Sequence, residues 1–144
     1  MAKVTFMELG FPIVLVDPPM KDVCGERVPD VNMRDLQAAV FQLLIIKSAR
    51  LTGAEVRFVR KYLRLRQVDL AGVLNMANHS VVSQWESRED DPAGMDYNTE
   101  VLLRGWMAVR AGQKERLADL LEHQLKALKP RAESPLEVRV SEAA

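Results

Sequence analysis

The feature that most constrains the fold is a series of three short amphipathic helical patterns joined by tight turns. Thr52 and Glu55 have the spacing of a capping box, in which the threonine oxygen accepts the third amide of the helix and the glutamate accepts the cap amide. A second helix is expected over residues 67–74, and Asn75 after it can adopt the left-handed conformation that a helix exit often needs. The third pattern covers residues 79–87. Helices in this order are typical of modules that place a reading helix in the major groove of DNA.

The three helices are expected to pack on one another through their apolar faces. The residues expected to point inward are Val56, Phe58, Val59, Tyr62 and Leu63 in the first helix, Val68, Leu70, Ala71 and Leu74 in the second, and Val82 and Trp85 in the third. Short polar side chains are left outward on the third helix. Glutamine binds adenine in bidentate fashion, and serine or histidine can serve either base edges or phosphate. We therefore predict that the base-reading residues are His79, Ser80, Ser83 and Gln84.

Cations are concentrated around these helices, although the formal net charge of the chain is zero. Between Lys47 and Arg66 the only acid is Glu55. A basic stripe on one element contributes more to phosphate contact than net charge does. The residues expected to contact DNA phosphates are Arg57, Arg60, Lys61, Arg64, Arg66, Gln67 and Arg88. The acidic patch that follows, within residues 86–100, is expected to be a solvated loop and not a metal site.

The N-terminal part is expected to form a small β element followed by a buried helix. Residues 12–16 are rich in β-branched side chains, and the prolines that follow stop the strand because proline cannot donate to a ladder. A second strand is expected around residues 23–28, with Cys24-Gly25 at its turn. Asn32 is expected to cap a helix that runs to about residue 47.

The C-terminal part is expected to contain two more helices and a strand. Asn98 should cap a helix to about residue 109. Its inward residues would be Val101, Leu102, Leu103, Trp106 and Met107. Gly112 separates it from a last helix over residues 113–128, whose leucines follow the i, i+3, i+4 spacing of an apolar stripe. A strand-like piece follows at residues 136–140.

These patterns predict a mostly α fold with a small N-terminal β element and a helix-turn-helix helical domain. Three parts are expected: a β-plus-helix module for dimer or partner binding (residues 1–50), a DNA-binding domain (residues 51–111), and a C-terminal helix and tail (residues 112–144). The dimer interface is left open among the leucine stripe, the strand near residues 13–16 and the tail strand.

Composition and missing motifs limit the class of protein. Cys24 is the only cysteine and cannot form an intrachain disulfide, so a reducing compartment is expected, with this thiol buried as a small apolar group. No apolar run approaches the roughly 20 residues of a membrane span, which leads us to expect a cytoplasmic protein with no membrane partner. No phosphate loop, catalytic triad or carboxylate pair is visible, so we predict neither an enzyme nor a cofactor.

Several of these residues resemble a known family. The residues Gln67, Leu70-Ala71, Leu74-Asn75 and Val82-Ser-Gln-Trp-Glu86 resemble the Xre (Cro/C1-type) helix-turn-helix family over about residues 55–104. The string from Leu51 to Lys61, with Leu102-Leu-Arg104, resembles more narrowly the MqsA-like (YgiT-type) antitoxins and regulators. Those proteins join a zinc-bound β module to an Xre-like domain. Here only Cys24 remains of the two Cys-x-x-Cys pairs, and one thiolate cannot make a structural zinc site, so we predict a degenerate module without metal.

The resemblance and the residues together favour a dimeric, sequence-specific transcriptional repressor. It would bind a palindromic operator in double-stranded DNA as a homodimer, because such proteins read two half-sites about one turn apart. The resemblance implies autoregulation and an antitoxin-like role with a toxin protein as partner. Two alternatives stay open: a phage or mobile-element regulator, for example of a counter-defence operon, without a toxin, and a protein–protein adaptor that has lost DNA binding.

Overall fold

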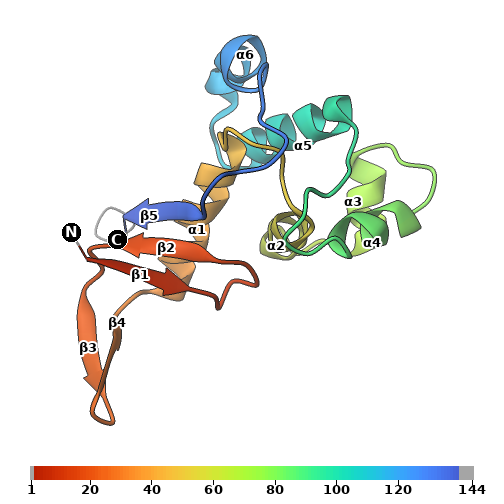
Figure 1. The fold of residues 1–144 in the computed structure, drawn as a ribbon. Helices are drawn as coiled ribbons and strands as arrows, with labels where there is room; N and C mark the ends of the chain where they lie inside the picture. Colours follow the sequence, from red (N-terminus) through yellow and green to blue (C-terminus); the bar gives the residue numbers. More distant parts are fainter. Residues whose placement is uncertain (1, 140–144) are drawn as a thin grey trace. The chain divides into compact units, whose positions relative to one another are not determined.

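The computed structural model describes residues 2–139, which are mostly α-helical with small β elements (Figure 1). The predicted fold class is confirmed at this level. The chain divides into two compact units, one from the described parts of residues 1–40 and 134–144 and one from residues 41–133. The boundaries expected after residues 50 and 111 do not coincide with this division, because the first unit includes a C-terminal strand and the second begins inside a helix.

The first unit is built on a three-stranded sheet of order β1-β2-β5. Its strands are β1 (Lys3–Phe6), β2 (Ile13–Val16) and β5 (Leu136–Arg139). Strand β1 runs antiparallel and β5 parallel to the central strand β2. Ile13, Leu15 and Val138 are buried, as alternation along a half-covered sheet requires. The expected strands near residues 12–16 and 136–140 are thus present, except that residue 140 lies outside the described residues.

A separate two-stranded hairpin consists of β3 (Met20–Val23) and β4 (Glu26–Pro29). Its turn residues have positive φ, 52° for Cys24 and 85° for Gly25, as the tightest hairpin turns require. The turn lies where the sequence predicts it. The expectation that Cys24 is buried is wrong, because the tip of the hairpin exposes its side chain.

Helix α1 (Met33–Ile45) starts as the sequence predicts. The Oδ1 atom of Asn32 accepts the amide of Asp35 at 3.1 Å, which satisfies one of the free amides of the first turn. Val40 and Leu44, one turn apart on the same face, are buried.

The second unit is a set of short helices. Its regular helices are α2 (Gly53–Tyr62), α3 (Gln67–Val73), α4 (Ser80–Glu86) and α5 (Tyr97–Arg110). The predicted capping box of α2 is confirmed: Thr52 Oγ1 accepts the Glu55 amide at 3.2 Å, and Glu55 Oε1 accepts the Thr52 amide at 2.9 Å. No helix within residues 2–139 is long and apolar enough to cross a bilayer.

Three side chains predicted to point inward are exposed instead. They are Tyr62 at the end of α2, Val68 in α3 and Leu102 in α5. Each lies on an apolar pattern broader than the face that its short helix buries. Helix α5 also begins earlier than predicted. Its N-cap residue is Asp96 and not Asn98, and the Asp96 carbonyl oxygen accepts the Glu100 amide at 2.9 Å.

The prediction of one regular helix over residues 113–128 is wrong. Three short, consecutive helical segments of different winding are found instead: η1 (Lys114–Arg116), α6 (Leu117–Asp119) and η2 (Leu120–Gln124). Gly112, with a φ of 75°, separates them from α5 as predicted. Because the winding changes along this segment, the leucine stripe is broken: Leu120 and Leu125 are buried whereas Leu121 is exposed.

Candidate nucleic-acid interface

Helices α3 and α4 are joined by the short loop of residues 74–79. At the start of α3, Asp69 Oδ2 accepts the Arg66 amide at 2.9 Å and the Arg66 Nε at 3.0 Å. The hydrogen bond from the Arg66 side chain holds the pKa of Asp69 below its ordinary value. Asn75 leaves α3 with a φ of 57°, the left-handed conformation that the sequence predicts.

Helix α4 buries one face and exposes the other. Val82 and Trp85, three residues apart, are buried as predicted. Asn78 Oδ1 accepts the Ser80 amide at 2.9 Å, which orders the start of the helix. The predicted base-reading residues are all exposed on α4 and its cap: His79, Ser80, Ser83 and Gln84.

Glu86, the last residue of α4, is buried at the centre of an ion-pair cluster. Arg60 from α2 binds it with two nitrogens, Nε to Oε2 at 2.6 Å and Nη2 to Oε1 at 3.0 Å. Gln67 Nε2 donates to Oε1 at 3.3 Å, and Arg57 Nε lies 3.5 Å from the same oxygen. A buried carboxylate needs such partners, because an unpaired charge in the interior is strongly destabilising. The cluster therefore fastens the end of α4 to α2 and to the start of α3.

This cluster changes the expected roles of Arg57 and Arg60. Arg57 Nη2 also donates to the Glu86 carbonyl oxygen at 3.0 Å and to Glu89 Oε1 at 3.3 Å. The hydrogen bond to Glu89 raises the pKa of Arg57. Both guanidinium groups are thus directed onto protein carboxylates, and their geometry does not favour the phosphate contacts predicted for them.

The start of α2 approaches the end of α4 so closely that only glycine fits at residue 53. A Cβ atom on Gly53 would lie 2.4 Å from the carbonyl oxygen of Trp85. The Gly53 amide donates to the Asp91 carbonyl at 3.1 Å, and the Ala54 amide donates to the Glu89 carbonyl at 2.9 Å. The first amides of α2 are therefore satisfied by the backbone that follows α4, which fixes the far end of the candidate reading helix.

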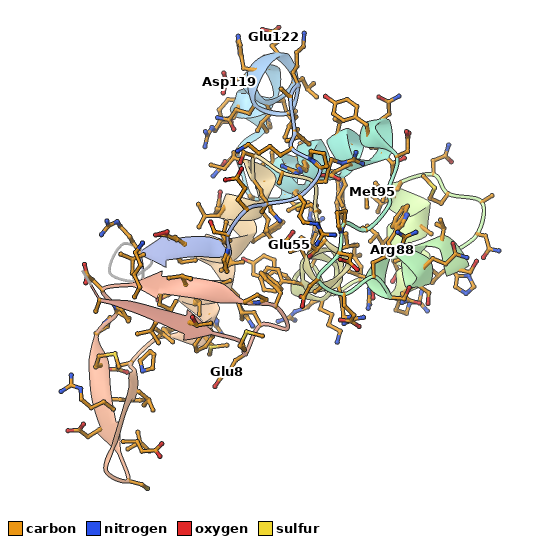
Figure 2. The ribbon with its side chains drawn as sticks, in the orientation of Figure 1. Glu8, Glu55, Arg88, Met95, Asp119 and Glu122 are labelled. Carbon is orange, nitrogen blue, oxygen red and sulfur yellow. The ribbon has the colours of Figure 1, made fainter. Side chains whose placement is uncertain are left out.

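Four predicted phosphate contacts are exposed, and three of them are not paired with a carboxylate of the described residues: Lys61, Arg64 and Arg88. Within residues 2–139 none of the three forms an ion pair with a carboxylate. Arg88, labelled in Figure 2, lies just past α4. A Cβ atom added to Gly94 would lie 3.4 Å from its guanidinium carbon. The other four predicted phosphate residues are engaged by side-chain carboxylates: Arg57, Arg60, Arg66 and Gln67.

A second buried carboxylate, Glu100 of α5, organises the chain that enters α2. Arg104 is fully buried, and its Nη2 donates to Glu100 Oε2 and to the Ala49 carbonyl, each at 2.5 Å. Arg50 Nε donates to Glu100 Oε1 at 2.7 Å, and the Leu51 amide donates to Oε2 at 3.1 Å. Burial lowers the pKa of Arg104, and the Glu100 charge opposes that shift.

The acidic patch is therefore not one solvated loop, and that expectation is wrong for Glu86 and Glu100. The exposed acids are Glu89, Asp90, Asp91 and Asp96. Asp91 Oδ1 accepts Arg131 Nη2 at 2.9 Å. Across residues 2–139 no group of three His, Cys, Asp or Glu side chains is arranged to hold a metal ion.

The sequence carries a signal for both carboxylate clusters that residue-type reasoning missed. Glu86 follows the buried Val82 by four residues, so the two share one face of α4. The same spacing joins Glu100 to Arg104 within α5. An acidic residue on an apolar helix face needs a partner of opposite charge when it is buried, but the sequence alone does not identify which arginine is that partner.

Comparisons with models of protein families, with curated proteins and with solved structures found no match. The geometry of the site consists of a helix anchored on one face and polar on the other, with three exposed cations on and beside α2 and α4 that form no ion pair with a carboxylate within residues 2–139.

Proposed function

We propose that the protein is a sequence-specific, double-stranded DNA-binding transcriptional repressor with an Xre-like helix-turn-helix. One observation carries the proposal: α4 fills its inner face with Val82, Trp85 and Glu86 and presents only short or neutral polar side chains outward. A helix of this kind can enter the major groove, which is about 12 Å wide and displays a distinct donor and acceptor pattern for each base pair.

In this proposal the exposed residues divide into base readers and phosphate binders. Gln84 reads an adenine through its N6 and N7 positions, and Ser80, Ser83 and His79 contact neighbouring base edges. Lys61, Arg64 and Arg88 bind backbone phosphates and contribute affinity that does not depend on sequence.

We further propose that the repressor acts as a homodimer on a palindromic operator of its own operon. Two α4 helices related by a twofold axis would read half-sites about 34 Å apart. In the antitoxin-like form of the proposal, the N-terminal unit binds a toxin protein. In the alternative form, the protein regulates a phage or mobile-element operon and has no toxin partner, and the gene beside it would distinguish the two.

A second candidate function, a protein–protein adaptor, is favoured by the acids around α4. Glu89, Asp90 and Asp91 are exposed directly after the helix and would repel phosphate. Arg57 and Arg60, which would otherwise attract it, are neutralised by Glu86 and Glu89. In this candidate the polar face of α4 docks on another protein.

Binding of the full chain to the duplex upstream of its own gene, across a salt series, tests the choice. The repressor proposal predicts that this duplex binds about 10³-fold or more tightly than a scrambled duplex. It also predicts that log K falls against log salt with a slope of about −3 per protomer, since Lys61, Arg64 and Arg88, which form no ion pair with a carboxylate of residues 2–139, each displace about one counterion. Weak, equal binding to both duplexes would contradict the repressor and favour the adaptor.

A further inference from the structure

Helix α4 carries one apolar side chain on the flank between its buried and its exposed face. Val81 is half-buried, whereas its neighbour Val82 is fully buried. An α-helix turns by about 100° per residue, so Val81 lies about 100° around α4 from Val82. On the same side, Gln84 lies about 160° from Val82. Val81 and Gln84 are thus roughly 60° apart, and the exposed part of the valine adjoins the proposed adenine reader.

The position of Val81 along α4 also brings it close to base edges. It is the second residue of the helix, and the N-terminal residues of a reading helix are those that contact base edges. Val81 and Gln84 are separated by about 4.5 Å along the helix axis. This separation is similar to the roughly 3.4 Å between successive base pairs. Val81 therefore lies level with a base pair next to the one that Gln84 reads.

The chemistry of valine restricts what it can recognise in the major groove. Its side chain has no hydrogen-bond donor or acceptor, and the one apolar group that the four bases display there is the C5 methyl of thymine. A β-branched side chain in a helix is held largely in one rotamer. The methyl groups of Val81 are thus fixed before DNA arrives, and little side-chain freedom is lost on contact.

We propose that Val81 selects a thymine, through contact with its C5 methyl group, in a base pair next to the adenine read by Gln84. The inference rests on the proposed function and names part of the operator sequence that the same site takes. It adds an apolar contact to a face otherwise assigned to hydrogen-bonding side chains. A choice of base readers by polar residue type alone misses Val81, because only its half-exposed position on α4 distinguishes it from the buried Val82.

Replacement of thymine by uracil in the DNA tests this contact, because uracil pairs with adenine as thymine does and lacks only the C5 methyl group. The full chain is titrated with the duplex upstream of its own gene, in which each thymine is replaced by uracil in turn. Wild type should lose about fourfold in affinity at one thymine of each half-site, as expected for the burial of roughly one methyl group. Uracil at thymines that no side chain contacts should change nothing.

The variant Val81→Ala assigns the methyl contact to this residue. Its affinity for the unmodified duplex should fall, and uracil at the sensitive thymine should change that affinity by less than about twofold, because the two partners of one contact do not act additively. The matched control is Val109→Ala, an exposed valine of α5, which should respond to uracil as wild type does. Each protein is compared with itself on two duplexes, so a change in the folded fraction cancels.

The outcomes separate this inference from the proposed function. Wild type that prefers the upstream duplex to a scrambled one, but responds to uracil at no thymine, would refute the Val81 contact and leave the repressor standing. An equal uracil response of wild type and Val81→Ala would assign the methyl contact to another side chain and also refute the inference. Weak, equal binding of wild type to the upstream and scrambled duplexes would reject the repressor and this inference together.

Discussion

Two buried glutamates, Glu86 and Glu100, are each bound by two arginines, but the two clusters fix different parts of the second unit. Glu100 is sealed with Arg104, whose side chain has no exposed area, and the pair binds the backbone that leads into α2. Glu86 is equally buried, but one of its partners, Arg57, keeps a third of its side chain exposed. The contacts of its carboxylate join three helices, and all of them are made by side chains.

The difference teaches that two similar ion-pair clusters can contribute to separate properties. The Glu100 cluster fixes the chain path before the capping box, so it should determine the stability of the second unit. The Glu86 cluster fixes the end of the one helix whose outer face is polar, so it should determine how that face is held. Substitutions can separate the two contributions.

The largest effect is expected from Glu100→Ala. The change leaves Arg104 as a buried, uncompensated charge, and the free energy of unfolding should fall by about 3–5 kcal/mol. Chemical denaturation measures it. Glu133→Ala is the control, because the Glu133 ion pair with Lys129 is exposed and 4.0 Å long and should contribute less than about 1 kcal/mol. A loss as small as that of the control would show that the Glu100 cluster is not structural.

Glu86→Gln should destabilise less and act on DNA binding as well. A neutral amide still accepts a hydrogen bond from Arg60, so unfolding should become easier by about 1–3 kcal/mol. Cognate affinity should fall even though Glu86 is buried and does not face DNA, because the end of α4 is no longer held. The control is Glu89→Gln, an exposed partner of Arg57. Unchanged cognate affinity of fully folded Glu86→Gln would remove the positioning role.

The exposed cations on and just after α2 should differ from the engaged ones in their effect on the salt dependence of DNA binding. Lys61→Ala or Arg64→Ala should flatten the slope of log K against log salt by about one unit each, for every duplex alike. Arg57→Ala should leave the slope unchanged, since its charge is balanced by Glu86 and Glu89. Titration of each variant with the scrambled duplex measures this. A flatter slope for Arg57→Ala would contradict this expectation and would mean that the ion pairs of Arg57 with Glu86 and Glu89 open when the protein binds DNA.

The smallest effect is expected from Asp69, whose pKa Arg66 lowers. A carboxylate with a lowered pKa in the folded state stabilises the fold above its unfolded pKa of about 3.9, and this is lost as the pH falls through the folded value. The difference in Tm between wild type and Asp69→Asn should therefore shrink below about pH 4. A difference that stays constant through this range would show that the Arg66 contact does not stabilise α3.

Local signals predicted much of the fold. Thr52 with Glu55, Asn32, and the left-handed Asn75 were all found as predicted, because a cap or helix exit depends on residues within one turn. The division of α4 into a buried and an exposed face also followed from spacing alone.

Long-range contacts could not be predicted in the same way. Arg57 and Arg60 are residues of the type that binds phosphate. Only the folded structure shows that both pair with Glu86, which lies 29 and 26 residues further along the sequence. The leucine stripe near residue 120 repeats like a regular helix, yet tertiary packing winds the segment irregularly. The spacing of apolar residues depends on one helix alone, whereas the partner of a charge depends on how distant segments pack.

The central claim is that the outer face of α4 reads bases, and Gln84→Ala tests it most directly. The quantity to measure is the ratio of affinities for the cognate and scrambled duplexes, at one salt concentration, for wild type and variant. We predict that the variant loses about 1–3 kcal/mol on the cognate duplex and nothing on the scrambled one, with its free energy of unfolding unchanged. An unchanged affinity ratio, or an equal loss on both duplexes, would contradict the account.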